Sequence, residues 1–312
     1  MESRSRRARS RRYRRRLRRD SRAVVSVVGT LLALLVFFAL FGVFLTQYVP
    51  IWMTENEQAL AVQDQSALAQ LKSNIDLQAT DGGPPVFSTP FQLSSQGIPL
   101  VAQPTTGTIT FIPSSPGVFA NVSLRPGPGN AGGLYWQNIS LGTLSMQLPN
   151  RYYSPQSFSL ENDAVLQAQG NGQQLVDFPP TFAVNSTGAG IGVTATIIQL
   201  SGASTQATST GSQEVFSHLV FSQVITSTSP TATLKATFYE GTLFPCAWDA
   251  FLNSTIAQSG INFNGHYPTI TPSLASCTTG TSPFPVKVSF TNLASFTLIY
   301  AQIRLVIGVG VE

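Results

Sequence analysis

The hydrophobic and polar positions change their pattern twice along the chain, and the first pattern is an unbroken apolar run. Residues 23–45 contain no charge and no proline. As a helix, these 23 residues would extend about 34 Å, enough to cross a hydrocarbon core of roughly 30 Å. The apolar region of a cleaved signal peptide is shorter, about 7–15 residues. The pattern therefore predicts a transmembrane helix over residues 23–45.

The second pattern, over residues 46–80, is helical but amphipathic. Pro50 lacks the amide that would bond to Thr46, so a kink is expected there, and the Asp81–Pro85 segment ends the helix. We expect a helical stalk whose apolar stripe packs either on the chain's own β domain or against helices of neighbouring subunits. The stripe consists of Ala59, Leu60, Ala67, Leu68, Leu71 and Ile75.

Residues 81–312 are expected to fold as an extracellular, mainly β domain, either as one unit or as two sub-sheets. Short β-branched and aromatic runs are separated by Pro, Gly and Asn at intervals of roughly 10–15 residues, which is typical of an antiparallel β-sandwich. The last run, Phe296–Val311, contains Gln302 and Arg304, so a central strand is favoured over a second span. Other examples of such runs are Thr108–Ile112, Val118–Leu124, Gly142–Leu148, Ala164–Gln169, Gly192–Leu200, Val215–Ile225, Thr231–Tyr239 and Val286–Phe290.

One short helix, Ala247–Ile256, interrupts the strands. Its spacing places Trp248 and Leu252 on one face, together with either Phe251 or Thr255. This face is expected to pack at the edge of the sandwich, and an aromatic platform for a ligand is the alternative.

Two cysteines, Cys246 and Cys277, flank this helix. Outside the cell, two cysteines in one domain most simply form one disulfide. Closing a loop of about 31 residues would contribute roughly 3–4 kcal/mol in the chain-entropy description. Two buried free thiols are the alternative.

Charge adds an orientation to this layout. The chain carries 18 Lys+Arg and 14 Asp+Glu, and twelve of the bases are arginines within residues 1–22. This Arg-rich leader or tail, on one side of the span, predicts a cytoplasmic N-terminus and an external remainder. Tyr48 and Trp52 are then expected at the external membrane interface. An RNA-binding arm is the other interpretation of the arginines, but their position favours anionic lipid. The acidic remainder argues against nucleic acid as a partner.

Candidate chemistry is sparse. The chain contains two Cys and two His and lacks the H-E-x-x-H, C-x-x-C, G-x-S-x-G and P-loop motifs. His218 is predicted in a strand and His266 in a turn, where structural or solvated roles are favoured. Glu161 and Asp163 have two interpretations: they take part in Ca²⁺ binding or acid–base chemistry, or they are ordinary surface acids. We therefore predict no enzyme, no metal site and no cofactor.

Four N-x-S/T sequons lie on the predicted exterior side, and they are candidate N-glycosylation sites. They begin at Asn121, Asn138, Asn185 and Asn253.

The segment Arg22–Leu32, RAVVSVVGTLL, resembles the start of archaeal type IV pilin-like and flagellin-like proteins. Tyr48–Met53, followed by a Gln-rich stalk and β strands, is similar to archaeal membrane-anchored surface proteins of this class. The resemblance implies that a prepilin-peptidase-like enzyme cleaves between Ala23 and Val24. It also implies that like subunits associate through the N-terminal helix.

The expected function is that of a structural cell-surface protein. The chain would be a pilin-like subunit in a surface filament, or a single-pass anchor that displays its β-sandwich outside the cell with the lipid bilayer as partner. The alternative is a membrane-tethered binding module that captures a glycan, a solute or a partner protein through the sandwich loops. Loop aromatics gathered around one cleft would favour this alternative, and the candidates are Tyr135, Trp136, Tyr152 and Tyr153.

Overall fold

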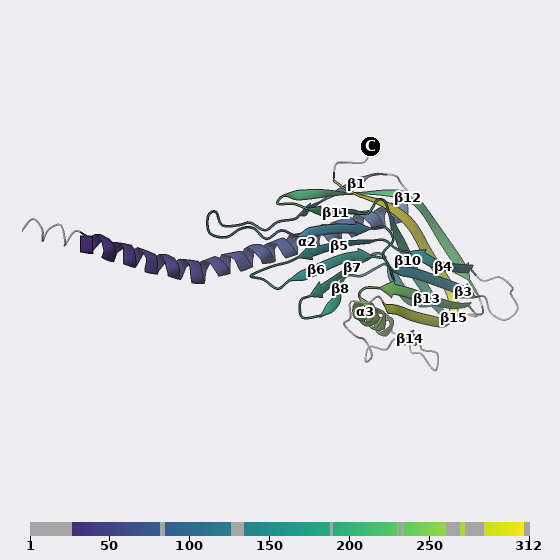
Figure 1. Ribbon diagram of the computed structural model, residues 1–312. Coiled ribbons are helices and arrows are strands. Elements are labelled where there is room, and N and C mark those ends of the chain that lie inside the picture. Colours follow the sequence, from purple (N-terminus) through teal and green to yellow (C-terminus); the bar gives the residue numbers. More distant parts are fainter. Residues whose placement is uncertain are drawn as a thin grey trace, which may run out of the picture.

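The computed structural model shows a long helix that projects from a β-sandwich (Figure 1). The residues that the structure describes are 27–81, 85–125, 134–187, 190–229, 231, 234–259, 269–271 and 284–308. Within these ranges the protein is mainly β, as predicted.

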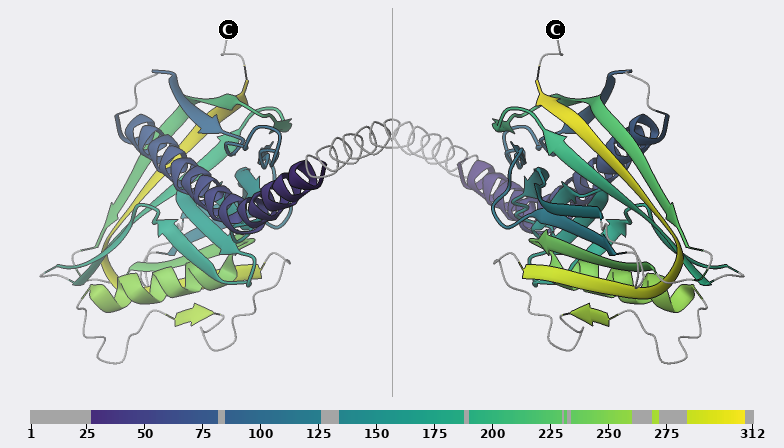
Figure 2. Two further views of the ribbon diagram at one scale, coloured as in Figure 1. Left: turned by 90° about the vertical axis from the view of Figure 1, so that its left-hand side faces the viewer. Right: turned by 90° about the vertical axis from the view of Figure 1, so that its right-hand side faces the viewer.

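The described chain begins with a long helix that starts at Val27. The helix is interrupted by a π-helical turn, η1 (Phe44–Tyr48), and continues as α2 (Val49–Asp81). The amide of Val49 donates to the carbonyl of Phe44, because the next residue, Pro50, has no amide to offer Thr46. The helix changes direction in this part (Figure 2). The irregularity expected at Pro50 is therefore a π turn that lies just before it.

The strands form two sheets of nine and six strands. The larger sheet has the order β1-β12-β15-β13-β3-β4; off this path, β10 and β14 pair with β15, and β9 pairs with β10. The smaller sheet has the order β11-β2-β5-β6-β7-β8. The larger sheet comprises β1 (Phe87–Gln92), β3 (Phe119–Arg125), β4 (Leu134–Ser140), β9 (Phe182–Thr187), β10 (Gly190–Ser201), β12 (Ser212–Thr228), β13 (Leu234–Thr242), β14 (Thr269–Thr271) and β15 (Phe284–Ile307). The smaller comprises β2 (Thr108–Ile112), β5 (Thr143–Leu148), β6 (Gln156–Glu161), β7 (Ala164–Gln169), β8 (Gln174–Phe178) and β11 (Thr205–Thr208).

Two features of the larger sheet differ from the expectation. The pair β10–β15 is parallel, whereas the other pairs of strands in the described chain are antiparallel. The runs Val286–Phe290 and Phe296–Val311, predicted as separate strands, belong to the single strand β15. Asn292, with φ 59°, lies between them, and its left-handed conformation redirects the strand without ending it. β15 pairs with β13 up to Leu293, with β10 from Leu293 onward and with β12 from Ser295 onward.

The helix α2 is part of the hydrophobic core. Its stripe residues Leu60, Leu68, Leu71 and Ile75 are buried and pack with strand residues of both sheets. Of the two arrangements considered for the stripe, the structure has the one in which it docks on its own β domain. The segment expected as a stalk is therefore largely a core helix, and its stripe is not available to neighbouring subunits.

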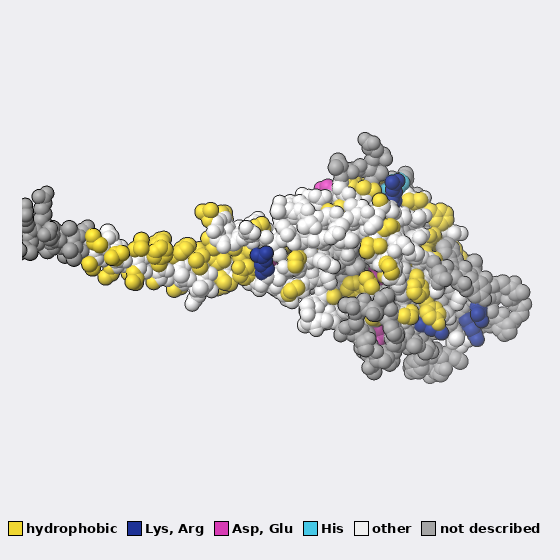
Figure 3. Space-filling view, viewed as in Figure 1, with side chains coloured by type: hydrophobic (Ala, Val, Ile, Leu, Met, Phe, Trp, Pro, Cys, Tyr) yellow, Lys and Arg dark blue, Asp and Glu magenta, His cyan; other side chains and the backbone are white. Residues whose placement is uncertain are grey.

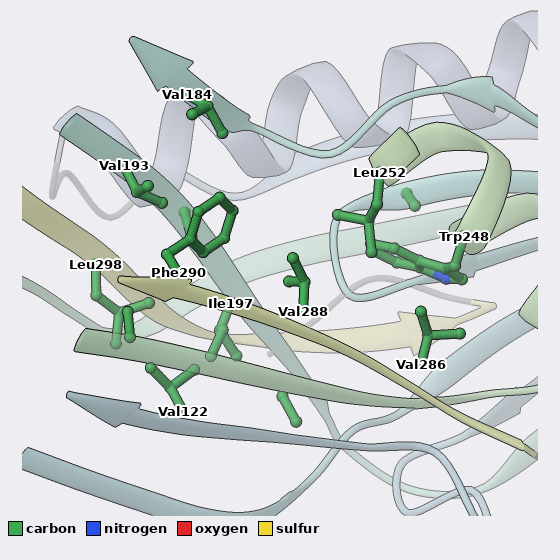
Figure 4. Close-up of a cluster of buried hydrophobic side chains, with 14 of the residues drawn as sticks. Val122, Val184, Val193, Ile197, Trp248, Leu252, Val286, Val288, Phe290 and Leu298 are labelled. Carbon is green, nitrogen blue, oxygen red and sulfur yellow. The ribbon is translucent and has the colours of Figure 1, made fainter. Parts of the chain in front are cut away.

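The helix α3 (Pro245–Gln258) confirms the predicted short helix. Trp248, Leu252 and Ile256 are buried on one face, and Figure 4 shows Trp248 and Leu252 pointing toward Val286 and Val288 of β15. Trp248 is only 5% exposed. A ligand platform on its ring is therefore excluded, and its role is packing.

Candidate functional site

Three parts of the structure carry the functional argument: an exposed apolar helix, a buried glutamate that holds two loops, and a buried acidic cluster. The first, which we call the anchor segment, is Val27–Leu45. Its apolar side chains lie outside the sandwich, and Leu35 is 68% exposed. The helix is long and apolar enough to cross a membrane. So much contiguous apolar surface is unfavourable in water.

Exposed hydrophobic side chains continue from the anchor segment toward the sandwich (Figure 3), and the predicted interface residues Tyr48 and Trp52 are among the exposed residues of this part. Each packs on Phe44, with ring centroids 6.3 Å and 5.7 Å from its ring. These rings lie where the apolar run gives way to the sandwich, which suits the boundary between hydrocarbon and water.

The Glu57 clamp joins the helix to two loops of the sandwich. Glu57 is completely buried, and its carboxylate accepts hydrogen bonds from the Thr105 hydroxyl (2.5 Å) and from the amides of Arg151 (3.1 Å), Tyr152 (2.8 Å) and Tyr153 (2.7 Å). Burial would raise the pKa of Glu57, but these hydrogen bonds lower it below its usual value. The side chain is therefore ionised at neutral pH and fixes both loops to α2.

A second carboxyl group, Asp64, lies on the same buried face of α2. Burial raises the pKa of Asp64 to about 8, because the charged form loses its hydration. Asp64 is therefore mostly protonated at pH 7.

The acidic cluster is built on the turn between β6 and β7. Asn162 (φ 41°) and Asp163 (φ 66°) are both left-handed, as a two-residue type I′ hairpin requires. Glu161 and Asp163 are buried, so the interpretation of this pair as ordinary surface acids is wrong. The reason is that α2 and α3 cover the turn, through Lys72 and Trp248.

Lys72 of α2 neutralises one side of the cluster. Its Nζ lies 3.0 Å from Asp163 and 2.7 Å from Asp76, and the second oxygen of Asp163 accepts from the Thr181 amide at 2.7 Å. Burial lowers the pKa of Lys72, but the two carboxylates raise it above its ordinary value. Lys72 is therefore charged and ties the helix to the β6–β7 turn.

The other side of the cluster contains two glutamates. Glu161 accepts from Trp248 Nε1 (3.2 Å) and from the Thr242 hydroxyl, while Glu240 accepts from Asn162 Nδ2 (2.7 Å). Burial raises the pKa of Glu161 to about 7, and burial together with Glu161 raises that of Glu240 well above its usual range. An adjacent cavity of about 40 Å³ has room for only a few water molecules. The hydrogen bonds of Glu161 connect the β6–β7 hairpin to β13 and α3, and a cavity of this size is too small for an organic substrate.

The other residues singled out in the sequence are scattered. His218 lies in β12 opposite Arg304, while His266 lies outside the described residues. Tyr152 and Tyr153 contact the Glu57 clamp. Tyr135 and Trp136 belong to β4 of the larger sheet.

The cleavage residues Ala23 and Val24 lie outside the described residues, as does Cys277, so the cleavage and the pairing of Cys246 with Cys277 stay predictions. Cys246 lies in the first turn of α3.

The four sequons lie on different elements, and glycosylation stays a prediction. Asn121 is half-buried in β3, Asn138 belongs to β4, and Asn185 is exposed in β9. Asn253 is exposed on α3, where its Nδ2 donates to the carbonyl of Asp249 at 2.9 Å.

Sequence reasoning missed Glu57, Asp64 and Glu240. A signal for the first two was present, because residues 57 and 64 fall on the helical face defined by Leu60, Leu68 and Leu71. A carboxyl group on an apolar stripe indicates a buried polar contact. Glu240 had no such signal, since its partner Asn162 is remote in sequence.

Across the ranges that the structure describes, no group of three or more His, Cys, Asp or Glu side chains is arranged to hold a metal ion. Comparison with protein families, with curated proteins and with solved structures found no match for this chain. The resemblance to archaeal pilin-like proteins therefore rests on the N-terminal sequence.

Proposed function

We propose that this chain is a structural cell-surface protein, a single-pass membrane anchor that displays a β-sandwich outside the cell. One observation carries the proposal: the same helix is apolar and exposed over Val27–Leu45 and is built into the sandwich core from Leu60 onward. The first part requires a lipid or protein environment, and the second connects it to the folded domain without a flexible linker.

The contacts of α2 support a rigid display. The Glu57 clamp and the Lys72–Asp163 ion pair fix the helix to the sandwich at two points about fifteen residues apart, or roughly 22 Å along the helix. A domain held in this way keeps one orientation relative to its membrane helix. The arginines of residues 1–22 would hold the other end of the helix in the cytoplasm.

A filament subunit is the less favoured form of the same proposal. Packing against neighbouring subunits was one of the two arrangements considered for the stripe, but the stripe is buried in the chain's own core. Association of like subunits would therefore have to use the anchor segment, after a prepilin-peptidase-like cleavage between Ala23 and Val24.

Membrane extraction of charge variants tests the anchor. Replacing both Leu34 and Leu35 by Asp places two charges in the apolar run, each costing about 2.5–3.5 kcal/mol in a bilayer. Alkaline washing should leave the unmodified protein in the membrane and release much of the double Asp variant. The matched control replaces the same residues by Ala. An equal distribution of the Asp variant and the unmodified protein would contradict the anchor.

A further inference from the structure

The loop between β1 and β2 has an apolar tip. Residues 97–104, GIPLVAQP, contain no charge, and the side chains of Leu100 and Val101 are exposed. Figure 3 shows a hydrophobic projection beside the helix, and Figure 1 shows the loop running back along the helix, beyond the rest of the described sandwich, toward the bend.

This tip is preformed. Ile98 and Ala102 exchange backbone hydrogen bonds of 2.8 and 2.9 Å, and Val101 donates to the Ile98 carbonyl at 3.1 Å. Gly97 permits the two arms to approach, since a Cβ there would lie 2.7 Å from the nitrogen of Pro104. Internal pairing of the backbone lowers the cost of moving the tip into an apolar environment.

The base of the loop is attached to the helix just beyond the aromatic side chains. Asn56 donates from Nδ2 to the carbonyl of Gln96 at 2.9 Å, and Thr105 is held by the Glu57 clamp. Asn56 lies about 12 Å along the helix from Tyr48. Because Ile98 and Ala102 close a turn, the tip is not a fully extended chain, but Figure 1 shows it lying back along the helix toward the bend near η1, which ends at Tyr48.

We propose that the loop tip, Ile98–Val101, inserts into the interface of the external leaflet and forms a second contact between the sandwich and the lipid bilayer. This inference rests on the proposed anchor. It follows from continuity: an uncharged apolar tip lies beside the helix where the exposed aromatic side chains mark the membrane boundary. The two contacts together would set the tilt of the sandwich on the membrane.

Site-specific photocrosslinking in the full-length protein tests the inference. A benzophenone amino acid replaces Leu100 in one variant, Leu35 of the anchor segment in a second, and Val224, an exposed apolar residue of β12, in a third. Each variant is reconstituted in phosphatidylcholine–phosphatidylglycerol vesicles and irradiated, and adducts are identified by intact mass. We expect lipid adducts at positions 35 and 100, with the yield at 100 about tenfold above that at 224.

The outcomes separate the two proposals. A lipid adduct at position 35 but not at position 100 would overturn the loop contact and leave the anchor intact. An adduct at position 100 to a second copy of the chain would also overturn it, because the tip would then be a protein interface. Absence of lipid adducts at both positions would refute the anchor together with the loop.

Discussion

Replacement of Glu57 by Gln removes one negative charge from the site where α2 meets the Thr105 and Tyr152 loops. Gln keeps one acceptor oxygen but presents an NH₂ group to the amides of Tyr152 and Tyr153, which need an acceptor. The substitution therefore leaves buried donors facing one another.

The magnitude follows from the four hydrogen bonds that the carboxylate accepts. A hydrogen bond to a charged group contributes about 1.5–3 kcal/mol, but bonds that share one acceptor are not additive. Arg151 is an exposed residue, so water can replace part of the hydrogen bond that its amide loses. We expect the Glu57→Gln variant to lose about 2–4 kcal/mol of stability at pH 7.

Thermal and urea unfolding of the full-length protein in detergent, followed by circular dichroism, measures this loss. Glu55→Gln is the matched control, because Glu55 is exposed on the same helix and the charge change is identical. Since the pKa of Glu57 is lowered on folding, its contribution is complete above the unfolded pKa and disappears as the pH falls through the folded value. Equal stability of the two variants at pH 7, or a difference that does not shrink as the pH falls below the ordinary range of a carboxyl group, would refute the clamp.

Three further predictions concern the core, the buried acid and the cysteines. Leu68→Ala in the buried stripe should cost about 2–5 kcal/mol, whereas Leu35→Ala in detergent should change stability by less than about 0.5 kcal/mol; equal losses would contradict the docked helix. Asp64 has a pKa of about 8 in the folded protein and an ordinary value of 3.8, so between these two pH values it makes the stability fall as the pH rises. Asp64→Asn should therefore reduce this slope by about 1.4 kcal/mol per pH unit. An unchanged slope in pH-dependent urea unfolding would be inconsistent with a buried titrating acid. Non-reducing peptide mapping should find Cys246 linked to Cys277, and ready alkylation of both without reductant would show that the pairing is wrong.

Local patterns were sufficient to predict the class of the fold and some of its elements, but not every strand. The bounds of β2 (Thr108–Ile112) and β7 (Ala164–Gln169) agree with the predicted strands, because alternation and turn residues act within a few positions. The long helix and α3 followed from apolar periodicity in the same way.

Long-range pairing could not be predicted in this way. The parallel pairing of β10 with β15 joins segments about a hundred residues apart, and no local pattern encodes which strands meet. The burial of Glu161 and Asp163 could not be predicted for the same reason, since Lys72 and Trp248, which cover them, come from helices distant in sequence. The turn itself, with polar residues between apolar strands, has the composition of a surface turn.

The central claim is that one membrane helix holds the sandwich outside the cell. Lysine labelling on intact cells tests this claim most directly. The chain has three lysines, Lys72, Lys235 and Lys287. Lys235 is exposed on β13, whereas Lys72 is buried. A membrane-impermeant amine reagent should modify Lys235 in intact cells and leave Lys72 unmodified, in protein that remains in the membrane after alkaline washing. Modification of Lys235 only after lysis would contradict the external sandwich.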